Sequence, residues 1–411
     1  MVSMAEAQRF NQLNTIVDIH AHPVLKTYLF DYNLYDMHKN HFPFIDFNPF
    51  YLQTDIPKLL QGGVDVVLST VYLPEKPFID NCTLMGGVFK ILKNFFTSLT
   101  DKVEDDSSSN APFDQTMGII DQFESKVNEA RSKGFSLSVP KNYDELQKAI
   151  DRSEIAFLHA VEGAHSLGRT HQDPSKYLSN LKLLQDRGVC QMTLAHFYPN
   201  DITCQVTGLP PTIRKILECQ NTSNLGKGLT PIGEGVVREM LRIGMVVDLA
   251  HSTPRARKEV FDINRSLGDS RRPLVFSHGG VQKLFLDQSS PDKFYNLDDD
   301  EVKEIQNCHG VIGLIADNYW VFGEEEKFLQ FNPGIPKLIE TIDYINNITG
   351  TYENIAIGTD YDGFTDTSDD LEDPSEMPNL TRNLLNHIND PKQVKLILGG
   401  NALRVLKEGW I

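Results

Sequence analysis

Eight short runs of apolar, mostly β-branched residues recur along the chain, each bounded by polar or turn-forming residues. Runs of this length without regular polar alternation are typical of strands that are buried on both faces, as in parallel sheets. Eight is the number of strands in a closed β/α barrel. The runs occupy residues 16–19, 64–73, 156–161, 190–194, 245–249, 274–277, 311–316 and 355–358.

Segments with apolar residues at helical spacing lie between most of these runs. The alternation of strand and helix predicts an α/β fold, the (β/α)8 TIM barrel. The size of the chain agrees, since 411 residues with 40% hydrophobic content can form one large elaborated barrel domain, which we expect to span residues 1–411. The helical segments are residues 176–186, 232–243, 254–267, 298–307 and 335–346.

Two insertions and a tail interrupt the regular spacing. Residues 74–155 follow the second run and contain a Phe-rich amphipathic stretch at 88–99 and a second helical pattern at 115–133. Residues 197–230 follow the fourth run, and we expect them to form a substrate loop above the mouth of the barrel. Residues 375–411 are predicted to form helices that close the structure.

Charge and cysteine content exclude several classes of function. A net charge of -17 argues against a surface that binds nucleic acid or anionic membranes, because both need clustered Lys and Arg. The five cysteines include no C-x-x-C pair, so we expect neither a disulfide framework nor a thiolate zinc site. No apolar stretch is long enough to span a bilayer, and the N-terminus has no signal-peptide pattern. These features predict a cytoplasmic protein.

The first apolar run ends in a pair of histidines, His20 and His22. Strand side chains repeat every second residue, so both imidazoles lie on one side of the backbone and can hold one metal ion. A polar strand end without a ligand role is the alternative for this pair taken alone. The residues at the ends of the other predicted strands decide between a metal-binding pair and a polar strand end.

Five further candidate residues follow five other runs. Barrel enzymes build their active sites at the carboxyl ends of their strands, where these residues are expected to meet. Five of the chain's 12 histidines then lie on one face of the barrel. Imidazole and carboxylate together suit Zn²⁺ or a similar ion. The residues are Glu162, His196, His251, His278 and Asp360.

This set of groups suits hydrolysis at a pair of zinc or similar first-row ions. Glu162 has two carboxylate oxygens and is the natural bridge between the ions, which can share a hydroxide and polarise a carbonyl. Asp360 is our candidate for moving the proton from the attacking water to the leaving nitrogen. His196 is the candidate donor to the tetrahedral oxyanion. Asp248 and Asp362 either orient neighbouring side chains or cap turns.

Several motifs resemble those of the renal or membrane dipeptidase family of the amidohydrolase superfamily. The similarity covers nearly the whole chain and includes Glu162-Gly-Ala-His, Leu194-Ala-His, Val247-Asp-Leu-Ala-His, Phe276-Ser-His and Gly358-Thr-Asp-Tyr-Asp-Gly. The resemblance implies a binuclear zinc site. His20, position 22 and Glu162 would bind one ion, and Glu162, His251 and His278 the other. His196 would contact the scissile carbonyl, and Asp360 would be the general acid and base. A possible homodimer is also implied.

The chain departs from this family pattern at two positions. The family usually has Asp where this chain has His22, and an imidazole there makes the cluster more positive by about one unit. The family's carboxylate-binding Arg corresponds to Tyr295, and a phenol cannot form a charged bidentate contact. We expect Tyr295 to contact the substrate.

The leading hypothesis is therefore a metallopeptidase that cleaves the amide bond of dipeptides or related small N-acyl amino acids. Another amidohydrolase reaction, the hydrolysis of a lactone or cyclic amide, is the enzymatic alternative because of His22 and Tyr295. A barrel that binds metal without catalysis is the alternative from a different class. Asp360 and His196 argue against it, because metal binding alone does not need them.

Overall fold

The sheet contains nine strands in the part of the chain that the structure describes. This computed structural model describes residues 1–40, 48, 50–77, 107–170, 173–216, 218–219, 223–324 and 331–411. Pairings between the named strands are all parallel. The strands are β1 (Val17–Ala21), β2 (Val66–Tyr72), β3 (Leu137–Ser138), β4 (Ile155–Glu162), β5 (Gln191–Thr193), β6 (Val246–Asp248), β7 (Val275–Gly279), β8 (Val311–Leu314) and β9 (Ile355–Ile357).

Eight of these strands close into a barrel. β1 pairs with β2 and β9, the pairs continue in order from β9 back to β4, and β4 also pairs with β2. β3 is an extra strand of two residues that pairs with the start of β4. The predicted (β/α)8 TIM barrel is confirmed, and each of the eight apolar runs overlaps one barrel strand. The sequence did not predict β3, because two residues carry no periodicity.

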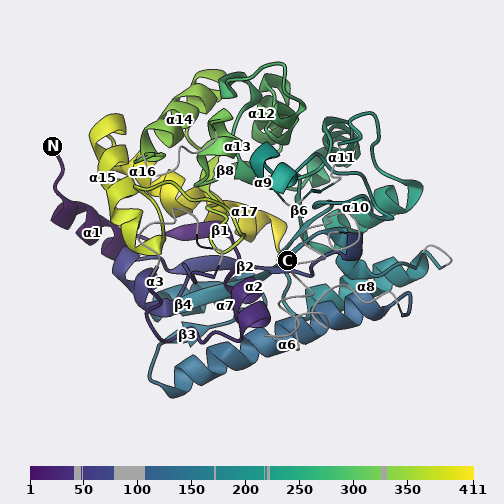
Figure 1. Cartoon of the computed structure of the whole chain (residues 1–411), viewed down its shortest axis with the longest axis horizontal. Helices are drawn as coiled ribbons and strands as arrows, with labels where there is room; N and C mark the ends of the chain where they lie inside the picture. The colour runs from purple at the N-terminus through teal and green to yellow at the C-terminus, as the bar shows by residue number, and fades with distance from the viewer. Residues whose placement is uncertain are drawn as a thin grey trace.

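Helices surround the barrel, and six of them overlap predicted segments. The long helix α6 runs along the lower edge of Figure 1. The six helices are α6 (Ala111–Ser132), α8 (Ser175–Asp186), α10 (Pro231–Ile243), α11 (Pro254–Ser266), α12 (Asp299–Asn307) and α14 (Ile335–Thr349).

The N-terminal helix α1 packs against α15, at the left of Figure 1. The predicted closing helices in residues 375–411 are present as α15 (Met377–Ile388), α16 (Pro391–Lys395) and α17 (Asn401–Gly409). The other helices are α1 (Met4–Leu13), α2 (Pro23–Phe30), α3 (Ile56–Gly62), α7 (Tyr143–Asp151), α9 (Pro211–Ile216) and α13 (Asn318–Phe322).

Local sequence signals set the starts of the helices that follow the strands. Thr230 and Thr253 accept hydrogen bonds at the first turns of α10 and α11, and a proline follows each of them. Asp298 forms a capping box with Glu301 at the start of α12. These caps satisfy N–H groups that the first turn leaves without partners, so each helix begins at a fixed distance from its strand.

The core has a large part between the strands and the helices and a smaller part at the amino end of the barrel. The smaller part contains Val17, Val246 and Val275, which are the first residues of their strands, together with Leu406 and Trp410. The apolar cluster therefore fills the amino end of the barrel. The carboxyl end is left for polar side chains.

Four further expectations have the following outcomes. The amphipathic stretch at 88–99 lies outside the described residues, and the single domain stays a prediction. Cys219 is disulfide-bonded, whereas the scattered spacing of the cysteines suggested no disulfide framework. Among the described residues, no helix has the length and apolar character needed to cross a membrane.

Candidate metal centre

Seven of the predicted site residues come together at the carboxyl end of the barrel, and all of them are buried. Two are within strands β1 and β7, one is the last residue of β4, and one directly follows β1. The remaining three each lie three residues beyond the last residue of β5, β6 or β9. The seven residues are His20, His22, Glu162, His196, His251, His278 and Asp360.

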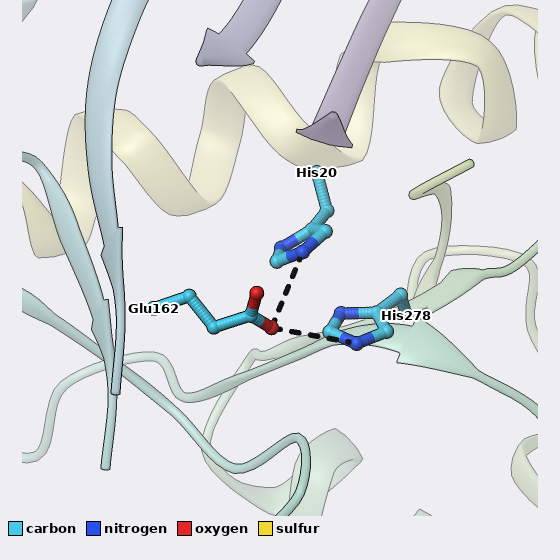
Figure 2. Close-up of side chains that lie close together, drawn as sticks. All are labelled: His20, Glu162 and His278. Atoms are coloured by element: carbon cyan, nitrogen blue, oxygen red, sulfur yellow. Dashed lines mark ion pairs between the residues drawn. The ribbon is translucent and has the colours of Figure 1, made fainter. Parts of the chain in front are cut away.

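Glu162 stands at the centre of the cluster. Its Oε1 atom lies 3.4 Å from His20 Nε2, 3.3 Å from His251 Nε2 and 3.7 Å from His278 Nε2. Figure 2 shows two of these contacts, with the His20 and His278 rings reaching the same carboxylate oxygen from different strands. Histidines from strands that are far apart in sequence therefore meet at one oxygen of Glu162.

The second oxygen of Glu162 faces other imidazoles. Oε2 lies 3.2 Å from His22 Nε2 and 3.4 Å from His196 Nε2. Asp360 Oδ1 is 3.3 Å from His22 Nε2 and 3.7 Å from His20 Nε2. The Nε2 atoms of His20 and His22 are 3.1 Å apart, so both histidines of the first motif point into one cluster.

The electrostatic states of Glu162, His20 and His278 suit metal binding. Burial would raise the pKa of Glu162, but the imidazoles of His196 and His20 and the close rings of His22 and His251 hold this pKa well below its usual range. Burial, with the neighbouring imidazoles, holds the pKa values of His20 and His278 well below 6.5. Glu162 is thus an anion and these two rings are neutral at pH 7, the forms in which they bind metal ions.

His22 and Asp360 interact strongly with each other. Burial lowers the pKa of His22, but hydrogen bonds to Asp360 and Glu162 outweigh it and raise this pKa to about 10. Burial raises the pKa of Asp360, while its hydrogen bond to His22 opposes the rise. Asp360 therefore takes up a proton more readily than an exposed aspartate.

The donor set fits metal ions. Glu162 Oε1 is buried and has no hydrogen-bond partner among the described residues, as expected of an atom shaped for a cation. Imidazole nitrogens and carboxylate oxygens suit zinc and similar first-row ions. Three groups in the described part of the chain could each hold an ion: His20, Glu162 and His278; His20, His22 and Asp360; Glu162, His196 and His251.

Glu75 is a member of the site that sequence analysis missed. Its Oε2 lies 3.4 Å from His196 Nδ1 and accepts a hydrogen bond from the Tyr72 hydroxyl at 3.1 Å. Its Oε1 accepts the N–H of Tyr198 at 3.1 Å. Glu75 thus contacts the side of His196 that faces away from Glu162. Its place three residues beyond β2, the spacing seen after β5, β6 and β9, was the available signal.

Tyr295 borders the cluster from a short 3-10 helix, Pro291–Tyr295. Its ring is stacked on Trp320, with 4.1 Å between ring centroids, and meets His251 edge-on at 5.2 Å. Tyr295 is only 1% exposed. The structure therefore places this predicted residue beside the site, and adds Trp320 from α13, which the sequence did not indicate.

The two aspartates that the sequence left open contact backbone groups. Asp362 accepts the N–H groups of Gln53 and Thr54 at 2.8 and 2.9 Å, which connects the segment after β9 to the segment before α3. Asp248 accepts the N–H groups of Ala250 and Ser277 at 3.1 and 3.0 Å. Both carboxylates therefore organise segments that carry site residues.

Comparisons with known proteins identify the family of the chain. The chain matches the model of the membrane dipeptidase family, peptidase family M19, over residues 4–409. An uncharacterized dipeptidase of Schizosaccharomyces pombe is 27% identical over 379 residues, which cover 89% of this chain and 81% of that protein.

Solved structures share the fold. A dipeptidase of family M19 has a TM-score of 0.71 at 16% identity, covering 97% of this chain and 99% of the other. A metallopeptidase from Rhodobacter sphaeroides, bound to a phosphinate mimic of the dipeptide L-Ala-D-Ala, has a TM-score of 0.70 at 16% identity and the same coverage. The chain belongs to the membrane dipeptidase family and is a metal-dependent hydrolase of the dipeptidase type.

Proposed function

We propose that this chain hydrolyses the amide bond of dipeptides or related small N-acyl amino acids at two zinc ions that share Glu162. The observation that supports this proposal is the position of the Glu162 carboxylate, which has imidazoles against both of its oxygens. Oε1 faces His20, His251 and His278, and Oε2 faces His22 and His196. A carboxylate with imidazoles on both oxygens is suited to bridge two ions.

Each of the two proposed ligand sets combines residues from different strands. His20, His22 and Glu162 would hold one ion, and Glu162, His251 and His278 the other. When bound, such a pair of ions supplies a water of lowered pKa and a polarised carbonyl. The close Nε2 atoms of His251 and His278, 2.9 Å apart, support a shared ligand role for this second pair.

Asp360 and His196 carry the steps that belong to the protein. Asp360 lies against His22 with a raised pKa, which suits it to accept the proton of the attacking water. As the water oxygen bonds to the carbonyl carbon and the C–N bond breaks, Asp360 returns that proton to the leaving nitrogen. His196 Nε2 points into the cluster and would donate to the oxyanion, while Glu75 contacts its Nδ1.

A second candidate function follows from Tyr295. The stacked Tyr295 and Trp320 rings present an aromatic wall to the site, and a phenol cannot pair with a carboxylate as a guanidinium does. Substrates with an uncharged end, including lactones and cyclic amides, suit such a wall. Preference among substrates separates the two candidates.

The test combines metal analysis with a substrate panel. Purified protein should contain two zinc ions per chain and hydrolyse dipeptides or N-acyl amino acids faster than lactones and cyclic amides. Glu162→Ala should lose metal and turnover. His387→Ala, which changes an exposed histidine paired with Asp343, is the matched control and should retain both. Fewer than two bound ions, or faster turnover of lactones and cyclic amides, would contradict the proposal.

A further inference from the structure

Two barrel strands contain one extra residue beside the metal centre. In β1, Asp18 pairs with Val67 and Ala21 with Ser69, so three steps along β1 match two steps along β2. In β7, Phe276 pairs with residue 312 and Gly279 with residue 314 of β8, again three steps against two. His20 and His278 lie inside these two β-bulges.

A bulge has a benefit and a cost. The extra residue changes which way the following side chains point, which is why bulges occur next to active sites. It also interrupts the ladder of hydrogen bonds, and a buried N–H without an acceptor is costly. Each bulge therefore needs another acceptor.

Asp18 supplies the acceptor for the bulge in β1. This buried carboxylate accepts the N–H of His20 and the N–H of Thr359 with its Oδ1 atom, both at 3.1 Å. The Thr359 hydroxyl donates to Oδ2. Thr359 directly precedes Asp360, so one carboxylate holds the backbone beside two site residues on neighbouring strands.

Asp248 repeats this arrangement at the bulge in β7. Its Oδ1 accepts the N–H of Ser277, which precedes His278, and the N–H of Ala250, which precedes His251. The Thr193 hydroxyl donates to Oδ2 at 2.7 Å. In both cases an aspartate accepts the N–H two residues ahead and an N–H from the neighbouring segment, and one of these two N–H groups belongs to a bulge.

We propose that Asp18 and Asp248 are paired positioning residues of the metal centre, each holding one bulge and the neighbouring strand end. Asp18 fixes His20 relative to Asp360, and Asp248 fixes His251 relative to His278. In Figure 2 the His20 and His278 rings reach one Glu162 oxygen. Their ring centroids are 3.9 Å apart. This inference rests on the proposed binuclear site.

The experiment measures metal affinity rather than turnover. Zinc binding to Asp18→Ala and Asp248→Ala is followed by chelator competition, and Co²⁺ absorption reports the ligand geometry. We expect each variant to weaken one of two binding steps by about 10- to 100-fold, the usual effect of removing a group that orients metal ligands. Asp18→Asn and Asp248→Asn retain a carbonyl acceptor and should keep most of the affinity.

Asp65→Ala is the matched control. Asp65 also accepts a backbone N–H between strands, that of Ile16 at 2.9 Å, but at the opposite end of the barrel. This variant should bind zinc like the wild type. Unfolding temperatures are measured for every variant, because a purely structural role of Asp18 or Asp248 would lower stability without changing either binding step.

The outcomes separate the inference from the proposed function. A wild type that binds fewer than two ions overturns the binuclear site itself. If the wild type binds two ions and the folded Ala variants bind zinc with unchanged affinity, only the positioning roles are overturned. The same conclusion follows if the Asn variants lose as much zinc affinity as the Ala variants, because the charge of the carboxylate and not its hydrogen bonding would then matter. Where an Ala variant fails to fold, Thr359→Val and Thr193→Val replace it, and wild-type affinity in both overturns the inference.

Discussion

Removal of the metal ions should lower the thermal stability of the protein by a predictable amount. The ligand groups come from β1, β4, β6 and β7, so they are close together only in the folded chain. Ions that bind the folded state and not the unfolded state stabilise it by mass action. At a free-ion concentration 1,000 times the dissociation constant, each ion contributes about 4 kcal/mol.

The length of the chain gives the entropy of unfolding, which converts this free energy into a shift of the unfolding temperature. An unfolding entropy of about 2.1 cal/mol/K per residue gives about 0.86 kcal/mol/K for 411 residues. Dividing about 4 kcal/mol by this entropy gives a shift of about 5 °C for one ion and about 10 °C for two.

Differential scanning calorimetry at a fixed scan rate tests the value. Chelator-treated protein is scanned with zero, one and two equivalents of zinc, and the transition should rise in two steps. Glu162→Ala should remove the shift because both ions lose a ligand, whereas His387→Ala should behave like the wild type. An identical transition with and without zinc, or a rise that is complete after one equivalent, would refute the reasoning.

Three further predictions concern single side chains. Asp360→Asn should retain two ions but lower kcat by about 100- to 10,000-fold, and wild-type turnover would exclude its proton-transfer role. Glu75→Ala should lower kcat by up to about 100-fold at unchanged metal content, because His196 loses the contact at its Nδ1; a KM effect alone would contradict this. Burial raises the pKa of Asp65 from 3.8 to about 6, although the hydrogen bond from Ile16 opposes the rise. The protonated carboxyl group of Asp65 therefore contributes fully to folding stability below pH 3.8, and this contribution is lost as the pH rises through 6. Asp65→Asn should therefore gain about 1–2 kcal/mol over the wild type between pH 4 and 8 in denaturant titrations, and a constant difference would show that the carboxyl group is not the cause.

The strands could be predicted because parallel barrel strands are buried on both faces and form uninterrupted apolar runs. The boundaries were less certain, as for the predicted strand 311–316, which ends in the structure as β8 at Leu314. Very short elements give no such pattern. The helix α13 is five residues long and follows no periodicity, yet it brings Trp320 against Tyr295.

The clustering of the candidate metal ligands could be predicted for a topological reason. All barrel strands are parallel, so a polar residue after any apolar run must lie at the same end of the barrel. Glu75 follows the same rule, but it falls in a predicted insertion and is one of many acidic residues in the chain. The bulges at His20 and His278 depend on register with the neighbouring strand, which the sequence of one strand does not contain.

The backbone at the site supports the view that function, rather than stability, selected its conformation. His251, Asp360 and Asp362 have φ angles of 59°, 62° and 66°, in the left-handed region that costs about 1–2 kcal/mol for residues with a Cβ. Asp31 and Asn389, in the same region, end helices, where this conformation is common. The three site residues instead follow strands, where the chain could continue without strain. A left-handed residue turns its segment sharply, and this turn directs the His251 side chain toward Glu162 and the Asp360 side chain toward His22. The strain is therefore best explained by the direction of these two side chains, and Asp362 offsets part of the cost by accepting the N–H groups of Gln53 and Thr54.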